Sequence, residues 1–343
     1  MKHIEFALDH FAADVLVGQS LTYGSIIASA RRRLPVASLG FCTYLWPTEQ
    51  GFNEQSEIAG WKRWRYENMA AQLNDLFRLY RLEAYESSCW GSPLLADLFL
   101  VRSVPELEPS PGHLPAQVHL VGNCLWEPTE HDAEFEAWCS HAANSGAPVV
   151  YVQQGRSFEL PSFWPTVMEV LEKLGCRVAA SVDKMDGDVG AFPPAAWVRP
   201  RVPQATVLRH AALVVASATT TSFLGALSAG IPCLLLPGGG EQPDVAALAE
   251  QAGVALTIRL TEATPERIEG ALRRLLTEGS FRERAQWYRQ AFAEVDSFAT
   301  AANLIEELGR TRCPVFRPSA EVFTAHSMDI HPCAWSAAQP LIS

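Results

Sequence analysis

Two short loops carry most of the side chains that could bind a ligand through hydroxyl, carboxylate and amide groups. The first loop, Ser217–Ser222, is rich in hydroxyls and follows the apolar run Ala212–Ala216. The second follows the apolar run Cys233–Leu236 and carries Glu241 and Gln242. We expect a helix directly after the first loop, and a helix N-terminus binds anions because its free N–H groups point at them. The first loop therefore predicts either a phosphate-binding site or an ordinary helix N-cap, since both use the same geometry.

The elements around these loops must hold them at one edge of a sheet. Both apolar runs are continuous rather than alternating, and a helix is expected after each, a pattern typical of parallel strands covered on both faces. The first helix is expected to end at Gly230, because glycine accepts the left-handed conformation found just past a helix end. In such sheets ligands bind beyond the carboxyl ends of the strands, so both loops are expected to face one ligand.

The order and spacing of these motifs resemble the donor-binding half of the UGT-like glycosyltransferases, a family with the two-domain GT-B fold. The resemblance extends loosely over residues 14–308. It is strongest at Val202-Pro-Gln204, the loop ending in Ser222, Ala226-Leu227, Gly230-Ile-Pro232, Pro237 and Glu241-Gln242. It implies an α/β protein of two Rossmann-like, doubly wound parallel-sheet domains, with a nucleotide sugar as co-substrate and no cofactor.

The resemblance implies donor-binding roles for eight positions. The phosphate side would involve Gly155, Arg156, Ser217, Thr219 and Ser222, the nucleobase Gln204, and the sugar hydroxyls Glu241 and Gln242. Each role has a plain alternative. Ser222 could be an N-cap, Glu241 and Gln242 a solvated loop, and Arg156 a surface charge.

Several of these positions depart from the family pattern. Where members usually have His-Gly-Gly at the start of the loop, this chain has Ser217-Ala218-Thr219. Gly225 stands where members commonly have a glutamate that binds the ribose hydroxyls. A hydroxyl can still donate a hydrogen bond, whereas Gly225 offers no side chain. We therefore expect a degenerate donor motif, with donor affinity weaker or differently arranged than in typical members.

The catalytic base is not identified. In many members it is a histidine on the loop after the first strand, in β/α units that precede the part resembled here. We therefore expect the chain to be N-terminally truncated relative to the family, with an incomplete first domain. The aspartate that orients this histidine in many members corresponds to Gln19, and we assign neither His3 nor His10 as the base.

Proline and polar residues suggest the domain boundary. Segment 106–115 is typical of a linker. We expect residues 1–115 to form the acceptor-side domain and residues 116–308 the donor-binding domain, which would open with a strand over 118–121. By the resemblance, the last helix (297–308) packs back on the first domain, and we expect residues 309–343 to be a disordered tail. An incomplete first sheet exposes an apolar edge, so we expect a second copy or another partner to cover it.

Composition excludes other functions. The formal net charge of −11 argues against a nucleic-acid partner. No stretch of 18 apolar residues and no signal peptide is found, so we expect a cytoplasmic protein without a membrane span. Eight cysteines without a Cys-x-x-Cys pair indicate reduced thiols. Close to the C-terminus lie four metal-capable residues to which we assign no metal: His326, Asp329, His331 and Cys333.

The sequence thus predicts an inverting glycosyltransferase that moves a sugar from a UDP- or TDP-sugar to an apolar small molecule or lipid. Aromatic residues of the first domain suit such an acceptor, unless they form its core: Phe41, Tyr44, Trp46, Phe52, Trp61 and Trp64. The alternative is a catalytically degenerate GT-B protein that serves as a binding or partner subunit. We expect the chain itself to be feebly active or inactive.

Overall fold

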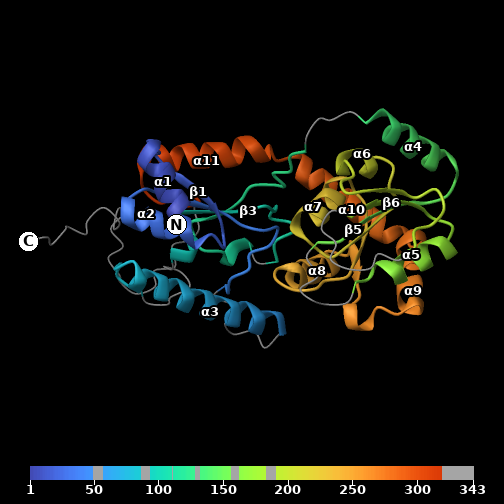
Figure 1. Ribbon diagram of the computed structural model, residues 1–343, viewed down its shortest axis with the longest axis horizontal. Helices are drawn as coiled ribbons and strands as arrows, with labels where there is room; N and C mark the ends of the chain where they lie inside the picture. Colours follow the sequence, from blue (N-terminus) through green and yellow to red (C-terminus); the bar gives the residue numbers. More distant parts are fainter. Residues whose placement is uncertain are drawn as a thin grey trace, which may run out of the picture. The chain divides into compact units, whose positions relative to one another are not determined.

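A computed structural model describes residues 1–48, 57–85, 93–109, 111–127, 132–155, 162–182 and 191–318 (Figure 1). The chain divides into two compact units. The first contains residues 1–122 and the chain from Val295 onward, and the second contains residues 123–294. Each unit has its own parallel β-sheet, so the expected α/β architecture of two parallel-sheet domains is confirmed.

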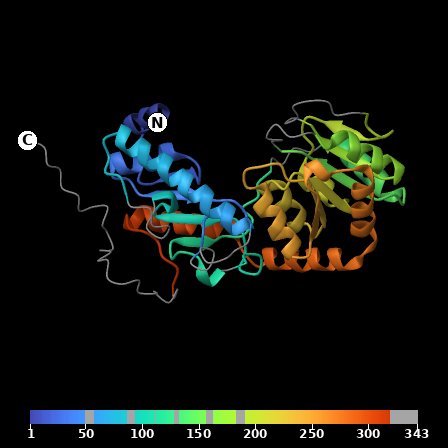
Figure 2. The same ribbon diagram turned by 90° about the horizontal axis from the view of Figure 1, so that it is seen from below.

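The first unit is built on a four-stranded sheet in the order β1-β2-β3-β4. Its strands are β1 (Leu16–Gln19), β2 (Val36–Leu39), β3 (Leu98–Val101) and β4 (Val118–Leu120). Its helices are α1 (Lys2–His10), α2 (Tyr23–Arg32), α3 (Glu57–Leu79) and α11 (Ser297–Thr311), with 3-10 turns at Pro93–Leu95 and Pro111–His113. Side chains of α2 and α3 share a buried core with β3 and β4, while α11 contacts β3. The two views show α3 and α11 on opposite sides of the sheet (Figures 1 and 2).

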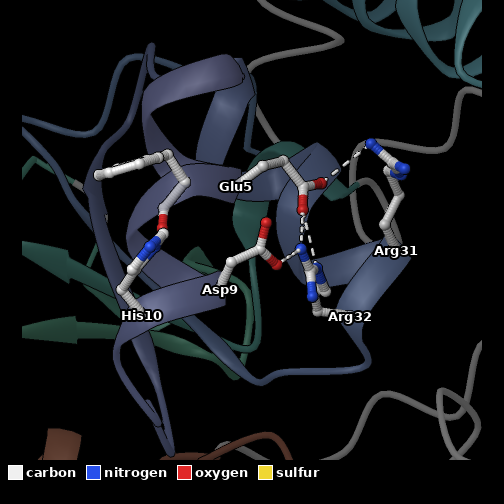
Figure 3. Close-up of polar contacts among 6 residues, drawn as sticks. Glu5, Asp9, His10, Arg31 and Arg32 are labelled. Atoms are coloured by element: carbon white, nitrogen blue, oxygen red, sulfur yellow. Dashed lines mark hydrogen bonds and ion pairs between the residues drawn. The ribbon is translucent and has the colours of Figure 1, made fainter.

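Ion pairs join helix α1 to α2. Arg32 pairs with Glu5 at 2.6 Å and with Asp9 at 2.5 Å, and Arg31 pairs with Glu5 at 2.9 Å (Figure 3). No residue of α1 is buried. An apolar groove of about 380 Å³ lies between α1 and β1. The attachment of α1 therefore includes partly exposed charges, which salt screens.

The second unit is built on a six-stranded sheet in the order β10-β9-β8-β5-β6-β7. Its strands are β5 (Val149–Gln153), β6 (Arg177–Ser181), β7 (Trp197–Arg199), β8 (Leu213–Ala216), β9 (Cys233–Leu235) and β10 (Ala255–Thr257). Its helices are α4 (Ala133–Asn144), α5 (Trp164–Lys173), α6 (Gln204–Leu208), α7 (Thr220–Ser228), α8 (Gln242–Gln251), α9 (Pro265–Thr277) and α10 (Gly279–Ala293), with a 3-10 turn at Leu260–Glu262.

Both faces of this second sheet are buried. Val150 and Val152 share a core with buried side chains of α5 and α9. Val149 and Tyr151, which point to the opposite face because side chains alternate along a strand, are also buried. The continuous apolar runs that predicted covered parallel strands are explained by this double burial.

The strand order reverses between β5 and β8. From β5 the chain continues to β6 and β7 on one side, and it then returns to place β8, β9 and β10 on the other. The loops that follow β5 and β8 therefore diverge at a topological switch point, where open α/β sheets bind their ligands.

The expected boundary between the domains is wrong. The strand expected to open the second domain is β4, and it pairs with β3 in the first sheet, with Phe99 opposite Val118. The segment between them, taken for a linker, connects two neighbouring strands and buries Leu107 and Leu114. Its prolines mark turns within a domain rather than a passage between domains.

The expected disordered tail is also wrong over residues 309–318. Helix α11 continues to Thr311. Beyond it, the Val315 N–H donates to the Asp97 carbonyl at 3.1 Å, and the Arg317 N–H donates to the Ala116 carbonyl at 2.9 Å. These bonds fasten the segment to the first unit. The four metal-capable residues named for the tail lie outside the described residues.

Candidate functional site

Gly155 and Ser217 join the loops after β5 and β8 at the switch point. The Gly155 N–H donates to Ser217 Oγ at 2.7 Å, and both residues are buried. A Cβ at position 155 would overlap the methyl group of Thr219 and press on Ser217 Oγ. Position 155 therefore requires glycine, because the two loops approach each other too closely for a side chain.

The loop after β8 leads into the N-terminus of α7. Ala218 is fully buried and has φ of 60°, the left-handed region that favours glycine. Thr219 is the N-cap residue of α7, and its Oγ1 lies 2.6 Å from Ser222 Oγ. Ser222 Oγ donates in turn to the Thr219 carbonyl at 3.1 Å. The loop thus keeps a glycine-type turn without a glycine, and its hydroxyls line the first turn of the helix.

Gln242 brings the loop after β9 to the same place. It is the first residue of α8 and is 1% exposed, and its Oε1 accepts a hydrogen bond from the Gly238 N–H at 2.7 Å. A Cβ at Gly155 would lie 3.6 Å from Gln242 Nε2, so the amide faces the loop after β5. Glu241, the N-cap residue of α8, is partly exposed beside it. Loops after three strands therefore converge on one edge of the sheet.

The Gln204 side chain lies over Gly225 in α7. Its Nε2 donates to the Thr221 carbonyl at 3.4 Å, and a Cβ at Gly225 would overlap the Gln204 amide. Gln204 is 9% exposed. The absence of a side chain at Gly225 and the position of the Gln204 amide are therefore one feature. The space left by the missing glutamate side chain is occupied by the amide of Gln204.

Gln153 was not singled out by sequence reasoning. It ends β5 at the switch point, and its side-chain oxygen is buried without a hydrogen-bond partner in the described part of the chain. Such an oxygen lacks compensation for its lost hydration, which a donor group on a bound ligand could supply. The available signal was a polar residue at the end of the apolar run Val149–Val152.

Two other positions do not join this cluster. Arg156 lies outside the described residues, although it follows Gly155 directly. Gln19, which corresponds to the family's aspartate, ends β1 in the first unit and is exposed. Among the residues with described positions, no three His, Cys, Asp or Glu side chains are placed to hold a metal ion.

The aromatic residues proposed for the acceptor divide into two groups. Tyr44 and Trp46 are fully buried in the core of the first unit. Trp61 and Trp64, on α3, are 53% and 57% exposed, with ring centroids 5.4 Å apart in an edge-to-face arrangement. Phe41 packs partly buried against the core, and Phe52 lies outside the described residues. Among the described residues of this set, the tryptophan pair thus remains the candidate surface for an apolar molecule.

The described helices include none that is both long and apolar enough to cross a membrane. This finding covers the helices of both units.

Comparison with known proteins places this site in context. Residues 166–308 match the family described as the erythromycin biosynthesis protein CIII-like, C-terminal domain. The chain is 27% identical to the 4'-demethylrebeccamycin synthase of Lentzea aerocolonigenes over 331 residues, covering 88% of this chain and 75% of that protein. It is 27% identical over 217 residues to a PGL/p-HBAD biosynthesis glycosyltransferase of Mycobacterium tuberculosis, covering 63% of this chain but only 49% of that protein.

Solved structures confirm the architecture. The spinosyn rhamnosyltransferase SpnG, complexed with thymidine diphosphate, superposes with a TM-score of 0.62 at 17% identity, covering 88% of this chain and 75% of that one. At this identity the likeness establishes the fold. The chain therefore has the GT-B fold, and the resemblance of its sequence to the GT-B glycosyltransferases is confirmed.

Proposed function

We propose that the chain is an inverting glycosyltransferase that moves a sugar from a UDP- or TDP-sugar to an apolar small-molecule or lipid acceptor. One observation carries the proposal. The loops after β5, β8 and β9 converge at the switch point of the second sheet and bring Gly155, Ser217 and Gln242 together. The similar proteins support it, because they include a 4'-demethylrebeccamycin synthase and a spinosyn rhamnosyltransferase complexed with thymidine diphosphate.

The proposed reaction makes specific demands on this edge. The acceptor hydroxyl oxygen bonds to the anomeric carbon from the side opposite the diphosphate. The bond from that carbon to the diphosphate oxygen breaks, and the diphosphate leaves with the electron pair. The acceptor proton passes to a base, a role for which we assign no residue.

The α7 N-terminus suits the leaving diphosphate. Its free N–H groups and helix dipole favour negative charge, and Thr219 and Ser222 add hydroxyl groups. To serve a phosphate, these hydroxyls must exchange part of their mutual hydrogen bond for one to the ligand. Glu241 and Gln242 would hold the sugar hydroxyls, because carboxylate and amide groups fix orientation in a pocket of this kind.

The exposed tryptophans of α3 are our candidates for the acceptor. Trp61 and Trp64 together offer a broad apolar surface, and aromatic rings make a large contribution to binding apolar molecules. Of the aromatic residues that the sequence suggested for the acceptor, Tyr44 and Trp46 are buried, whereas these two tryptophans are exposed.

A second candidate function is a binding or partner subunit with the GT-B fold and no transfer activity. The packing of Gln204 over Gly225 favours it, because this site already fills the space of a missing donor contact with its own amide. The two candidates differ in a measurable way. Both bind the nucleotide, and only the enzyme releases it from a nucleotide sugar.

The test combines binding with turnover. A nucleoside diphosphate at about 100 times its dissociation constant should add roughly 2.7 kcal/mol of stability, which appears as a rise in the thermal unfolding midpoint. We expect this rise with UDP or TDP, and its reduction in Ser222→Ala and Gln242→Ala. Ser145→Ala, at the exposed end of α4, is the matched control. Release of UDP or TDP from a sugar donor, in the presence of apolar acceptors, then distinguishes the enzyme from the binding subunit.

A further inference from the structure

Trp126 is the most exposed of the large apolar side chains in the described residues, at 75%. A single exposed aromatic residue is common on protein surfaces and needs no explanation by itself. What sets Trp126 apart is that hydrogen bonds hold its segment against α6 and α7, the two helices that carry Gln204 and Ser222.

The segment Asn123–Glu127 is fastened to two helices of the second unit. Asn123 Nδ2 donates to Ser228 Oγ at 3.0 Å, and Ser228 is the last residue of α7. Glu127 Oε2 accepts a hydrogen bond from the Ala205 N–H at 2.8 Å, and Ala205 is the second residue of α6. Both ends of this short segment are therefore fixed by side-chain hydrogen bonds.

These two contacts show in which direction the segment runs relative to the strands of the sheet. Helix α7 starts at the carboxyl end of β8 and runs back along the sheet, so Ser228 lies toward the amino ends of the strands. Helix α6 follows the carboxyl end of β7, so Ala205 lies toward the carboxyl ends. The segment thus runs toward the ligand-binding edge, and Trp126 is at that end of it, one residue from Glu127 and its contact beside Gln204.

The chemistry of this end fits one part of a nucleotide sugar. The Glu127 carboxylate repels phosphate but not an uncharged heterocycle. An exposed indole on an anchored segment offers a flat face, and stacking on an aromatic side chain is tolerant of base identity because every base has a π-face. The phosphate-type features, by contrast, lie at the N-terminus of α7.

We propose that the Trp126 indole is the surface on which the nucleobase of the nucleotide-sugar donor stacks. This inference rests on the proposed function, since it assigns a further residue to the same donor site. Glu127 acts as a positioning residue, because its bond to Ala205 fixes the backbone next to Trp126 near the start of α6.

The test measures the affinity of the full chain for UDP and TDP by calorimetry, and for inorganic pyrophosphate by displacement of UDP. We expect Trp126→Ala to weaken UDP and TDP binding by about 5- to 150-fold, the range for loss of one base–aromatic stack. Trp126→Phe should keep most of the affinity, and pyrophosphate, which has no base, should bind Trp126→Ala and wild type equally. Trp287→Ala, an exposed tryptophan on α10, is the matched control.

The outcomes separate the two proposals. If wild type binds UDP and Trp126→Ala binds it equally well, the stacking role is overturned and the proposed function stands. An equal loss for UDP and pyrophosphate also overturns the stacking role, because the residue would then act on the phosphates or on the fold. If wild type binds no nucleoside diphosphate at all, the proposed function fails and this inference fails with it.

Discussion

At the scale of single residues, Gly225 and Gln204 pack against each other. The Gln204 amide occupies the space that a side chain at position 225 would need. Elsewhere in a helix a glycine-to-alanine change stabilises the protein by up to about 1 kcal/mol, because alanine has the better helix propensity. At Gly225 this gain is opposed by an overlap in a packed region.

We predict that Gly225→Ala lowers the free energy of unfolding by about 1–3 kcal/mol, the usual cost of overpacking. Gly270→Ala is the matched control. That glycine is exposed in α9 with no atom in the way of a Cβ, so the change should be neutral or stabilising. Denaturant unfolding of both variants checks the prediction. Adding Gln204→Ala to Gly225→Ala should restore part of the loss, and equal stability of the two glycine variants would contradict the packing argument.

Ala218 is the second residue-scale case. Its φ of 60° is unfavourable for any residue with a Cβ, by about 1–2 kcal/mol. Ala218→Gly should relieve this strain but also loses a buried methyl group. Ala216→Gly, in β8, loses an equally buried methyl group without relieving strain, since Ala216 has no positive φ.

We therefore predict that Ala218→Gly is more stable than Ala216→Gly by about 1–2 kcal/mol. The comparison of two denaturant midpoints measures the strain directly, because the methyl-group term is common to both variants. Equal midpoints would show that the loop relaxes around Ala218. If the loop binds a diphosphate, Ala218→Gly should bind the nucleotide at least as tightly as wild type.

At the scale of elements, the segment after α11 is fastened to the first sheet by His119. His119 is buried in β4, and its Nε2 lies 3.0 Å from the Val315 carbonyl oxygen, to which the ring N–H donates. Burial lowers the pKa of His119, and the charge of Arg317 lowers it further, while the hydrogen bond to Val315 and the charge of Glu307 act in the opposite direction.

The pKa direction determines the pH dependence of stability. Since the folded-state pKa lies below 6.5, the unfolded chain takes up the proton first as the pH falls. Stability should therefore be full above pH 6.5 and be lost as the pH falls from 6.5 toward the folded-state pKa. Asp97 has the opposite effect on stability at lower pH. Burial raises its pKa above 3.8, so the folded chain takes up this proton before the unfolded chain does.

We predict that His119→Gln, which keeps a donor for Val315, shows less loss of thermal stability between pH 7.5 and pH 5.5 than wild type. His141→Gln, on an exposed position of α4, is the matched control for replacing a histidine by glutamine. If His119→Gln and wild type lose stability in parallel, the pH dependence arises elsewhere.

The elements also show what the sequence could predict. The buried parallel strands of the second unit were predictable because double burial leaves continuous apolar runs such as Leu213–Ala216. The sheet to which β4 belongs was not predictable. Its pairing with β3 joins residues distant in the sequence, and no local sequence pattern specifies that pairing. At the site, the order of the loops was predictable from topology. The contact of Gln204 with Gly225 was not, because 20 intervening residues fold between them.

At the scale of the whole molecule, the feature of interest is the edge strand β1. It is the terminal strand of its sheet. Leu16 and Ser20 donate their N–H groups to the β2 side, so the intervening Val17 and Gln19 N–H groups point outward. Val17 is 55% exposed, and the apolar groove beside α1 adjoins the same strand. Such an edge is a template for pairing with another chain.

We predict that the chain self-associates through β1, with an average mass in sedimentation equilibrium that rises with protein concentration. Val17→Lys should abolish the rise, because natural proteins use lysine on edge strands to prevent such pairing. Trp287→Lys, which changes an exposed residue of the second unit in the same way, should leave association unchanged. A wild-type chain that stays monomeric at all concentrations would overturn the prediction. Association that survives Val17→Lys would move the contact away from β1. If association is confirmed, nucleotide binding by both variants also shows whether the donor site depends on association. Val17 lies in the first unit and the candidate nucleotide site in the second, so Val17→Lys changes association without changing a residue of that site.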